Sequence, residues 1–291
     1  MCEETTNTNG INVQTNFTFS EDPYEFDVDK NGFPALTREN VKRIDFIIHN
    51  DSNYRPLDEE SSDSISVFIR KFGRTTEVNN ILQIVSFIDK LNSTHQSSEG
   101  PKGGGKGCIE TAKYICSISN FYERLENGDP ELVNEIAKKS IKDRYTFSFA
   151  SKYCTYMSRA LFEDNYCIFD KVICDILPYY AWVYLGKDYT KLHHTKPRKK
   201  SMQKDQSLSS EIQKVSSIKD TFGKKDKGDY RGYRNLIDRI RYSAKDLFKN
   251  DYLIPLKDFD HLLWYYFKGK NPNFRITNAV NLVGKESSRI L

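Results

Sequence analysis

A mostly helical fold is what the sequence predicts, and three observations carry that prediction. Apolar residues recur at helical spacing in successive segments, most clearly from Glu77 to Leu91, where they form one continuous stripe. Helix start signals precede some of these segments, as in Asp129-Pro130, which supplies a cap and a first-turn proline. No stretch up to residue 144 reads as a convincing parallel strand. We therefore expect a helical bundle with a short extended segment near its N-terminal end.

The expected helices follow in order from the spacing of apolar residues and from their start signals. They span residues 37–48, 65–72, 77–91, 109–125, 130–139, 149–161, 171–177, 233–248 and 258–268. We divide the chain into five parts on this basis. These are a partly disordered or extended segment (1–36), a helical body (37–190), a basic flexible insertion (191–232), C-terminal helices that complete the body (233–268) and a polar tail (269–291).

Composition indicates a globular protein with a substantial core, since 38% of the residues are hydrophobic and 29% are charged. No apolar run is long enough to span a membrane, and the first ten residues lack the features of a secretory signal. The six cysteines contain no C-x-x-C spacing, which argues against a zinc or iron–sulfur site. We expect a cytoplasmic, nucleoid-associated protein with reduced thiols and no cofactor or metal.

Charge is distributed unevenly along the chain. Residues 1–64 hold fourteen acidic and five basic residues, whereas residues 186–249 hold eighteen basic and eight acidic ones. A chain polarised in this way can present a basic face to nucleic acid. The alternative is a solvated, lysine-rich insertion without a partner.

The stretch from Tyr145 to Tyr180 has the most specific pattern in the chain. A helix with one apolar face leads into a polar interruption and then a short apolar strip that ends at Phe169. Asp170 is well placed to cap a second helix. Lys152 opens the first helix, and eighteen positions separate it from Asp170.

This arrangement resembles the active-site segment of the HhH-GPD superfamily of base-excision DNA glycosylases, and most of all its compact 8-oxoguanine-glycosylase-like branch. The resemblance covers about 36 residues, roughly an eighth of the chain. It implies an HhH-GPD-like helical fold, with Lys152 as the catalytic nucleophile and Asp170 as the carboxylate that assists it. The implied partner is duplex DNA that carries a damaged or modified base.

The chemistry of these two residues suits removal of a base. Such an enzyme flips the nucleotide out of the duplex, and a carboxylate then stabilises the positive charge that develops on the sugar. A lysine amine can attack C1′ if burial lowers its pKa from about 10.4. We expect partial burial of Lys152 against Phe149, Tyr153 and Phe169. The resulting Schiff base would add lyase activity.

The sequence departs from the family pattern in the hairpin before the lysine, which contains no glycine. Phosphate ligands in its place are Lys142, Arg144, Ser148 and the hydroxyl of Thr146. Further DNA-binding candidates are Lys106, Lys196, Arg198, Lys199 and Lys200. Aromatic candidates for stacking on a flipped base are Phe147, Trp264, Tyr265 and Tyr266.

Two other functions fit parts of the sequence. The glycine-rich segment before Lys106 resembles part of a phosphate-binding P-loop, but Gly107 replaces the magnesium-binding Ser or Thr and no buried strand precedes it, so an NTPase is disfavoured. The main rival is a non-catalytic DNA-binding module, for example one associated with phage defence, and a chance resemblance in an unrelated helical protein stays open. The base removed is also open, whether an oxidised purine or a modified phage base.

Overall fold

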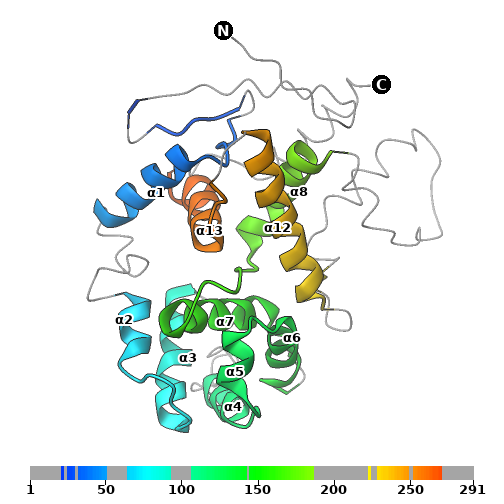
Figure 1. Ribbon diagram of the computed structural model, residues 1–291. Helices are drawn as coiled ribbons and strands as arrows, with labels where there is room; N and C mark the ends of the chain where they lie inside the picture. The colour runs from blue at the N-terminus through cyan, green and yellow to red at the C-terminus, as the bar shows by residue number, and fades with distance from the viewer. Residues whose placement is uncertain are drawn as a thin grey trace, which may run out of the picture. The chain divides into compact units, whose positions relative to one another are not determined.

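The computed structural model confirms the mostly helical fold (Figure 1). It describes residues 21–22, 25–29, 32–50, 64–92, 106–142, 144–186, 222–223, 228–248 and 252–270. Within these ranges no strand forms, and β-pairing is limited to the isolated bridges Val28–Pro34 and Ile141–Arg144. The first bridge closes the short extended segment that the sequence predicts before the first helix.

The chain divides into two compact units. Unit 1 comprises Met1–Ile44, Asp170–Lys224 and Asn235–Leu291, and unit 2 comprises Asp45–Phe169 and Lys225–Arg234. The predicted helical body, residues 37–190, therefore contributes helices to both units. A short piece of chain around residue 230 belongs to unit 2 although it follows a long part of unit 1 in sequence.

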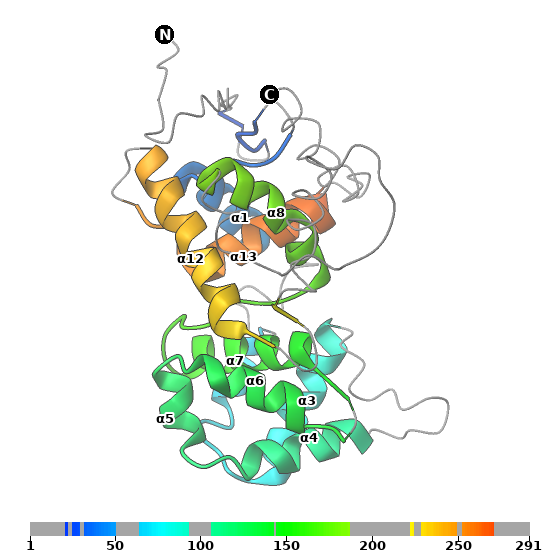
Figure 2. The same ribbon diagram turned by 90° about the vertical axis from the view of Figure 1, so that its right-hand side faces the viewer.

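Unit 2 is built around one helix, α7 (Phe147–Leu161), on which four other helices pack. Both views show α6 beside α7 (Figure 1, Figure 2). The other helices of unit 2 are α2 (Ile65–Arg70), α3 (Val78–Asn92), α4 (Lys106–Cys116), α5 (Phe121–Glu126) and α6 (Pro130–Lys139). Because α7 is surrounded, it buries polar as well as apolar side chains.

The predicted helix over 109–125 is wrong in one respect, because it is two helices. The break falls at Asn120, whose φ of 53° lies in the left-handed region, where an α-helix cannot continue. The Ser117 hydroxyl also donates a hydrogen bond to the Tyr114 carbonyl oxygen at 2.6 Å, at the end of α4. The periodicity of apolar residues runs through both helices and so hides the break.

Unit 1 contains most of α1 (Arg38–Asn50), α8 (Lys171–Leu185), most of α12 (Tyr230–Leu247), α13 (Leu256–Trp264) and a π-helical turn, η3 (Tyr265–Lys270). Tyrosine hydroxyls bind the extended N-terminal segment in this unit. Tyr180 donates to the Pro34 carbonyl oxygen at 2.8 Å, and Tyr184 accepts from the Leu36 N–H at 3.2 Å. The last predicted helix, over 258–268, is α13 followed by this π-helical turn.

A tight contact in unit 2 joins Gly228 to Tyr145. A Cβ atom at Gly228 would lie 1.7 Å from the Tyr145 hydroxyl oxygen. That hydroxyl is buried without a hydrogen-bond partner among the described residues, and burial raises its pKa to about 12. The ring stacks on Phe147 at a centroid distance of 5.6 Å, so it has little freedom to move aside.

We therefore expect Gly228→Ala to destabilise the protein by about 1–3 kcal/mol through overpacking. Tyr145→Phe should be neutral or stabilising, because it removes a buried hydroxyl that lacks a partner. Combining the two substitutions should recover most of the loss, which denaturant unfolding of the four proteins in the cycle would measure. Equal destabilisation by Gly228→Ala in both backgrounds would contradict the expected clash.

Candidate functional site

The candidate site begins with Lys152, which lies in the second turn of α7. The sequence places it at the start of the helix, but the helix begins at Phe147, after the N-cap residue Thr146. Lys152 is 7% exposed. A buried ammonium loses several kcal/mol of hydration, so a lysine is rarely kept in such a position without a specific role or partner.

Ser151, the neighbour of Lys152 on α7, holds the end of the apolar strip. Its hydroxyl accepts a hydrogen bond from the Phe169 N–H at 3.0 Å and donates to the Ser148 carbonyl oxygen at 3.0 Å. Phe169 is the last residue of this part of unit 2, and Asp170 follows it in the chain. The contact therefore connects α7 to the backbone that leads into the second candidate residue.

Asp170 is the N-cap of α8, as predicted. Its Oδ1 atom accepts a hydrogen bond from the Ile173 N–H at 2.9 Å, and the residue is 8% exposed. Its backbone is extended, as expected for a residue that caps a helix.

Lys152 belongs to unit 2 and Asp170 to unit 1. Both residues are buried, and their cooperation in one reaction stays a prediction. The same holds for the predicted aromatic wall, because Phe147 belongs to unit 2 while Trp264 and Tyr265 belong to unit 1.

The aromatic candidates pack against other rings within their units. Phe147 is 4% exposed and meets Phe169 edge-on at a centroid distance of 4.7 Å. Tyr265 is 9% exposed and lies 6.3 Å from the ring of Phe26. Tyr266 donates its hydroxyl to the Gly32 carbonyl oxygen. These contacts give each ring a packing role, and their part in base binding stays a prediction.

The predicted phosphate ligands cluster in part at the turn between α6 and α7. Lys142 is exposed there, while Arg144 and Ser148 are partly exposed. The hydroxyl of Thr146 is buried and hydrogen-bonded to that of Ser140 at 3.0 Å, so it is occupied within the turn. Lys106 is the first residue of α4. The basic cluster of Lys196, Arg198, Lys199 and Lys200 lies outside the described residues.

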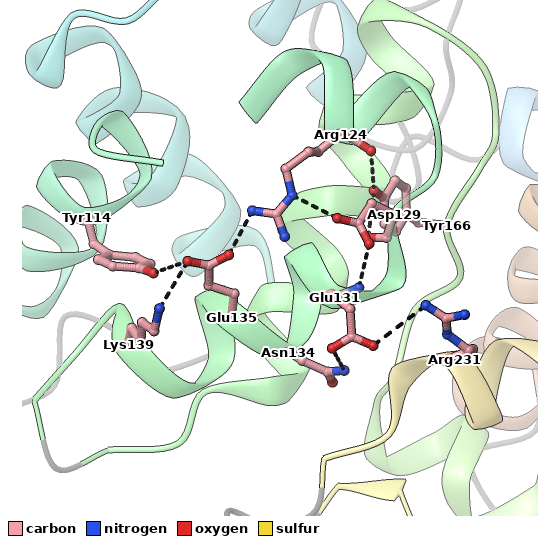
Figure 3. A network of polar contacts seen from close by, with 9 residues as sticks. All are labelled: Tyr114, Arg124, Asp129, Glu131, Asn134, Glu135, Lys139, Tyr166 and Arg231. Atoms are coloured by element: carbon pink, nitrogen blue, oxygen red, sulfur yellow. Dashed lines mark hydrogen bonds and ion pairs between the residues drawn. The ribbon is translucent and has the colours of Figure 1, made fainter. Parts of the chain in front are cut away.

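A polar network that the sequence reasoning missed joins α4, α5 and α6 (Figure 3). Glu135 accepts hydrogen bonds from Arg124 at 2.7 Å, Tyr114 at 2.8 Å and Lys139 at 3.2 Å. Arg124 also pairs with Asp129 at a distance of 2.7 Å. Asp129 is the N-cap residue of α6. Only the i, i+4 spacing of Glu135 and Lys139 signals this cluster in the sequence.

Protonation of the Glu135 carboxylate makes the free energy of unfolding depend on pH in the acid range. Burial alone would raise the pKa of this carboxyl, but the three hydrogen bonds to it outweigh burial and hold the pKa at about 2. Because this value lies below the ordinary 4.5, the ionised carboxylate stabilises the fold fully above about pH 4.5. That stabilisation is lost as the pH falls toward 2.

We expect Glu135→Gln to lower the free energy of unfolding by about 2 kcal/mol at pH 7 and to match the wild type near pH 2. Thermal unfolding of both proteins between these pH values would measure the convergence. Glu131→Gln, on the same helix with a side chain 57% exposed, should follow the wild type throughout. Curves for Glu135→Gln and the wild type that stay parallel down to pH 2 would contradict the assignment.

Neither a metal-binding cluster nor a helix suited to span a membrane occurs among the described residues. No group of three or more His, Cys, Asp or Glu side chains in these ranges could hold a metal ion. None of the helices described is both long and apolar enough to cross a membrane.

Comparison with known proteins places part of unit 2 beside a different family from the one that the sequence suggests. Residues 41–161, less than half of the chain, match the family model HI_0787_N, described as an N-terminal domain. The chain is 37% identical over 71 residues to an uncharacterized protein of Haemophilus influenzae. The aligned stretch covers 24% of this chain and 33% of that protein. The chain thus spans about a third of the length of this relative. No solved structure matches.

These findings correct the assignment to the HhH-GPD superfamily, which is wrong. The matched range contains Lys152 and is similar to another family model, and nothing found points to the glycosylase superfamily. The resemblance depended on one lysine in a helix and one aspartate at the start of the next. Lysines in helices and aspartates at N-caps are common for local reasons, so their spacing alone does not identify a family.

Proposed function

We propose that the chain is an enzyme that removes a modified base from DNA, with the amine of Lys152 as nucleophile. The burial of Lys152 carries the proposal. Burial penalises the charged ammonium relative to the neutral amine, and only the neutral amine can attack carbon. This argument uses the chemistry of the side chain and no family relationship.

In the proposed reaction the lone pair of the Lys152 Nζ atom forms a bond to C1′ of a flipped nucleotide. The bond between C1′ and the base nitrogen breaks, and its electron pair leaves on the base, which then takes up a proton. Opening of the sugar at O4′, with loss of the amine proton, gives a Schiff base between the lysine and the sugar. In this proposal the carboxylate of Asp170, at the start of α8, stabilises the positive charge on the sugar.

DNA is the substrate class that suits the residues around α7. Lys142 is exposed and Arg144 is partly exposed on the turn that precedes this helix. Cations in that position favour the phosphates of a nucleic acid. The proposal puts the protein on chromosomal or invading DNA in the cytoplasm, without a metal or other cofactor in the chemical step.

Borohydride trapping tests the proposal, because the reagent reduces a Schiff base to a stable amine. The wild-type protein would be incubated with duplexes that each contain one oxidised purine, oxidised pyrimidine, alkylated purine or uracil, together with an unmodified duplex. We expect base release and a covalent adduct with at least one modified duplex. Binding to duplexes without release or an adduct anywhere in the panel would contradict catalysis and favour a non-catalytic DNA-binding module.

A further inference from the structure

The exposed face of α12 carries an aromatic side chain where an amphipathic helix usually carries polar ones. Within unit 1 this helix buries Leu236, Ile237, Ile240 and Ala244, each at most 2% exposed. Tyr242 lies on the opposite face and is 56% exposed, more than any other aromatic residue that the structure describes. The fold therefore leaves most of this ring available to a partner.

Two cations lie beside the Tyr242 ring on the same face of the helix. Arg239 and Lys245 are three residues before and after it, and this spacing makes them neighbours, about 4.5 Å apart along the helix axis. Asp246 also lies on this face, so two cations stand against one carboxylate. The face belongs to a basic stretch, since residues 186–249 hold eighteen basic and eight acidic residues. Its charge suits a polyanion.

Contacts on both sides of Tyr242 fix its position on unit 1. Arg241, one residue before it, donates from Nε to the Ile254 carbonyl oxygen at 2.5 Å. Ser243, one residue after it, donates its hydroxyl to the Tyr184 carbonyl oxygen at 2.5 Å. The ring is thus presented by a rigid helix, and its side chain has only two torsions to order when a partner binds.

A second ring with a cation lies on a neighbouring segment of unit 1. Tyr252 is half-buried, and the guanidinium carbon of Arg38 lies 5.6 Å from its ring centroid. Ile254, two residues after Tyr252, accepts the hydrogen bond from Arg241 of α12. Unit 1 therefore presents two aromatic rings on adjoining segments, each accompanied by a basic side chain.

We infer that the face of α12 formed by Arg239, Tyr242 and Lys245 binds single-stranded DNA, with the Tyr242 ring stacked on a base. Every base has a π face, so a ring flanked by cations that meet phosphates binds a strand without reading its sequence. In a duplex the faces of the bases are covered by their neighbours, so a single strand is preferred. The choice of DNA over RNA rests on the proposed function, whereas the contact needs no modified base and no reaction at Lys152.

Binding of the full-length protein to a labelled, unmodified oligothymidylate of about 20 nucleotides tests the stacking contact. Tyr242→Ala should weaken binding about tenfold to a hundredfold, and Tyr242→Leu should do the same, because leucine is apolar but cannot stack. Tyr242→Phe keeps the ring and should bind within about twofold of wild type. Phe46→Ala is the matched control, since it removes a ring that is 42% exposed on α1, and it should bind like the wild type.

The salt dependence of binding tests the two cations. Arg239→Gln combined with Lys245→Gln should reduce the slope of log affinity against log salt by about 1.4, because each phosphate contact on a single strand contributes about 0.7. Lys71→Gln combined with Lys90→Gln removes the same charge from exposed positions in unit 2 and should leave the slope unchanged. The midpoint of thermal unfolding should stay at the wild-type value in all variants, because none of these side chains is buried.

Four results would overturn the inference. They are wild-type affinity of Tyr242→Ala, an equal loss in Tyr242→Phe and Tyr242→Ala, tighter binding of a matched duplex or of oligouridylate than of oligothymidylate, and no binding of any strand by the wild type. The proposed function fails separately. A protein that binds the strand through Tyr242 but releases no base contradicts base removal alone, and base release without ring-dependent binding contradicts this inference alone.

Discussion

Replacing Lys152 should abolish covalent trapping on DNA that contains an abasic aldehyde, with a loss of at least about a thousandfold in rate. The physical reason is that no other group in the proposed reaction supplies the nitrogen of the Schiff base. Lys152→Met is the preferred variant, because methionine has a similar length and suits a position that is 7% exposed.

The measurement is the yield of borohydride-stable adduct over time, with duplex binding measured in parallel. Lys171→Ala is the matched control, because this lysine lies one residue after Asp170 but is exposed and pairs with Asp175 at 2.7 Å. It should trap at the wild-type rate. An adduct of normal yield in Lys152→Met would show that another amine reacts and would remove Lys152 from the mechanism.

Local signals were sufficient to predict most of the helices. Asp129-Pro130 opens α6 at the expected residue, and Asp170 caps α8 by the expected bond to a backbone N–H three positions later. Such features depend on neighbours within one turn, which the sequence displays directly. The ends of the helices were harder to predict from the sequence. The left-handed conformation of Asn120 and the π-helical turn at Tyr265 interrupt segments whose apolar spacing continues unbroken.

The surroundings of the candidate site could not be predicted, because they are made by residues far apart in sequence. Tyr230 and Tyr233 bind a strip more than sixty positions earlier in the chain. In the sequence each reads as an ordinary aromatic residue on a helical face, and a hydroxyl that serves a backbone group leaves no periodic signal. The burial of α7 on nearly all sides was missed for the same reason, since its polar residues suggested an exposed face.

Asp170→Asn should separate the two roles of this side chain. Asparagine caps a helix about as well as aspartate, so the bond to the Ile173 N–H and the stability of α8 should be retained. The negative charge is lost, however, and with it the stabilisation of the cationic sugar. We expect base release to slow about a hundredfold to a thousandfold while the midpoint of thermal unfolding changes little. Asp170→Ala should lose both, with an added cost of about 1 kcal/mol in stability.

The Asp170→Asn prediction is tested most sharply by comparing base release with trapping on a preformed abasic aldehyde. Trapping on a preformed abasic aldehyde needs no cleavage of a glycosidic bond, so Asp170→Asn should keep it near the wild-type rate. Asp129→Asn, which alters the N-cap of α6 in the same way, should leave base release unchanged. Wild-type base release by Asp170→Asn would mean that the carboxylate only caps α8. Loss of trapping together with base release would instead assign Asp170 to the support of Lys152, because the charge would then matter even when no bond to a base is broken.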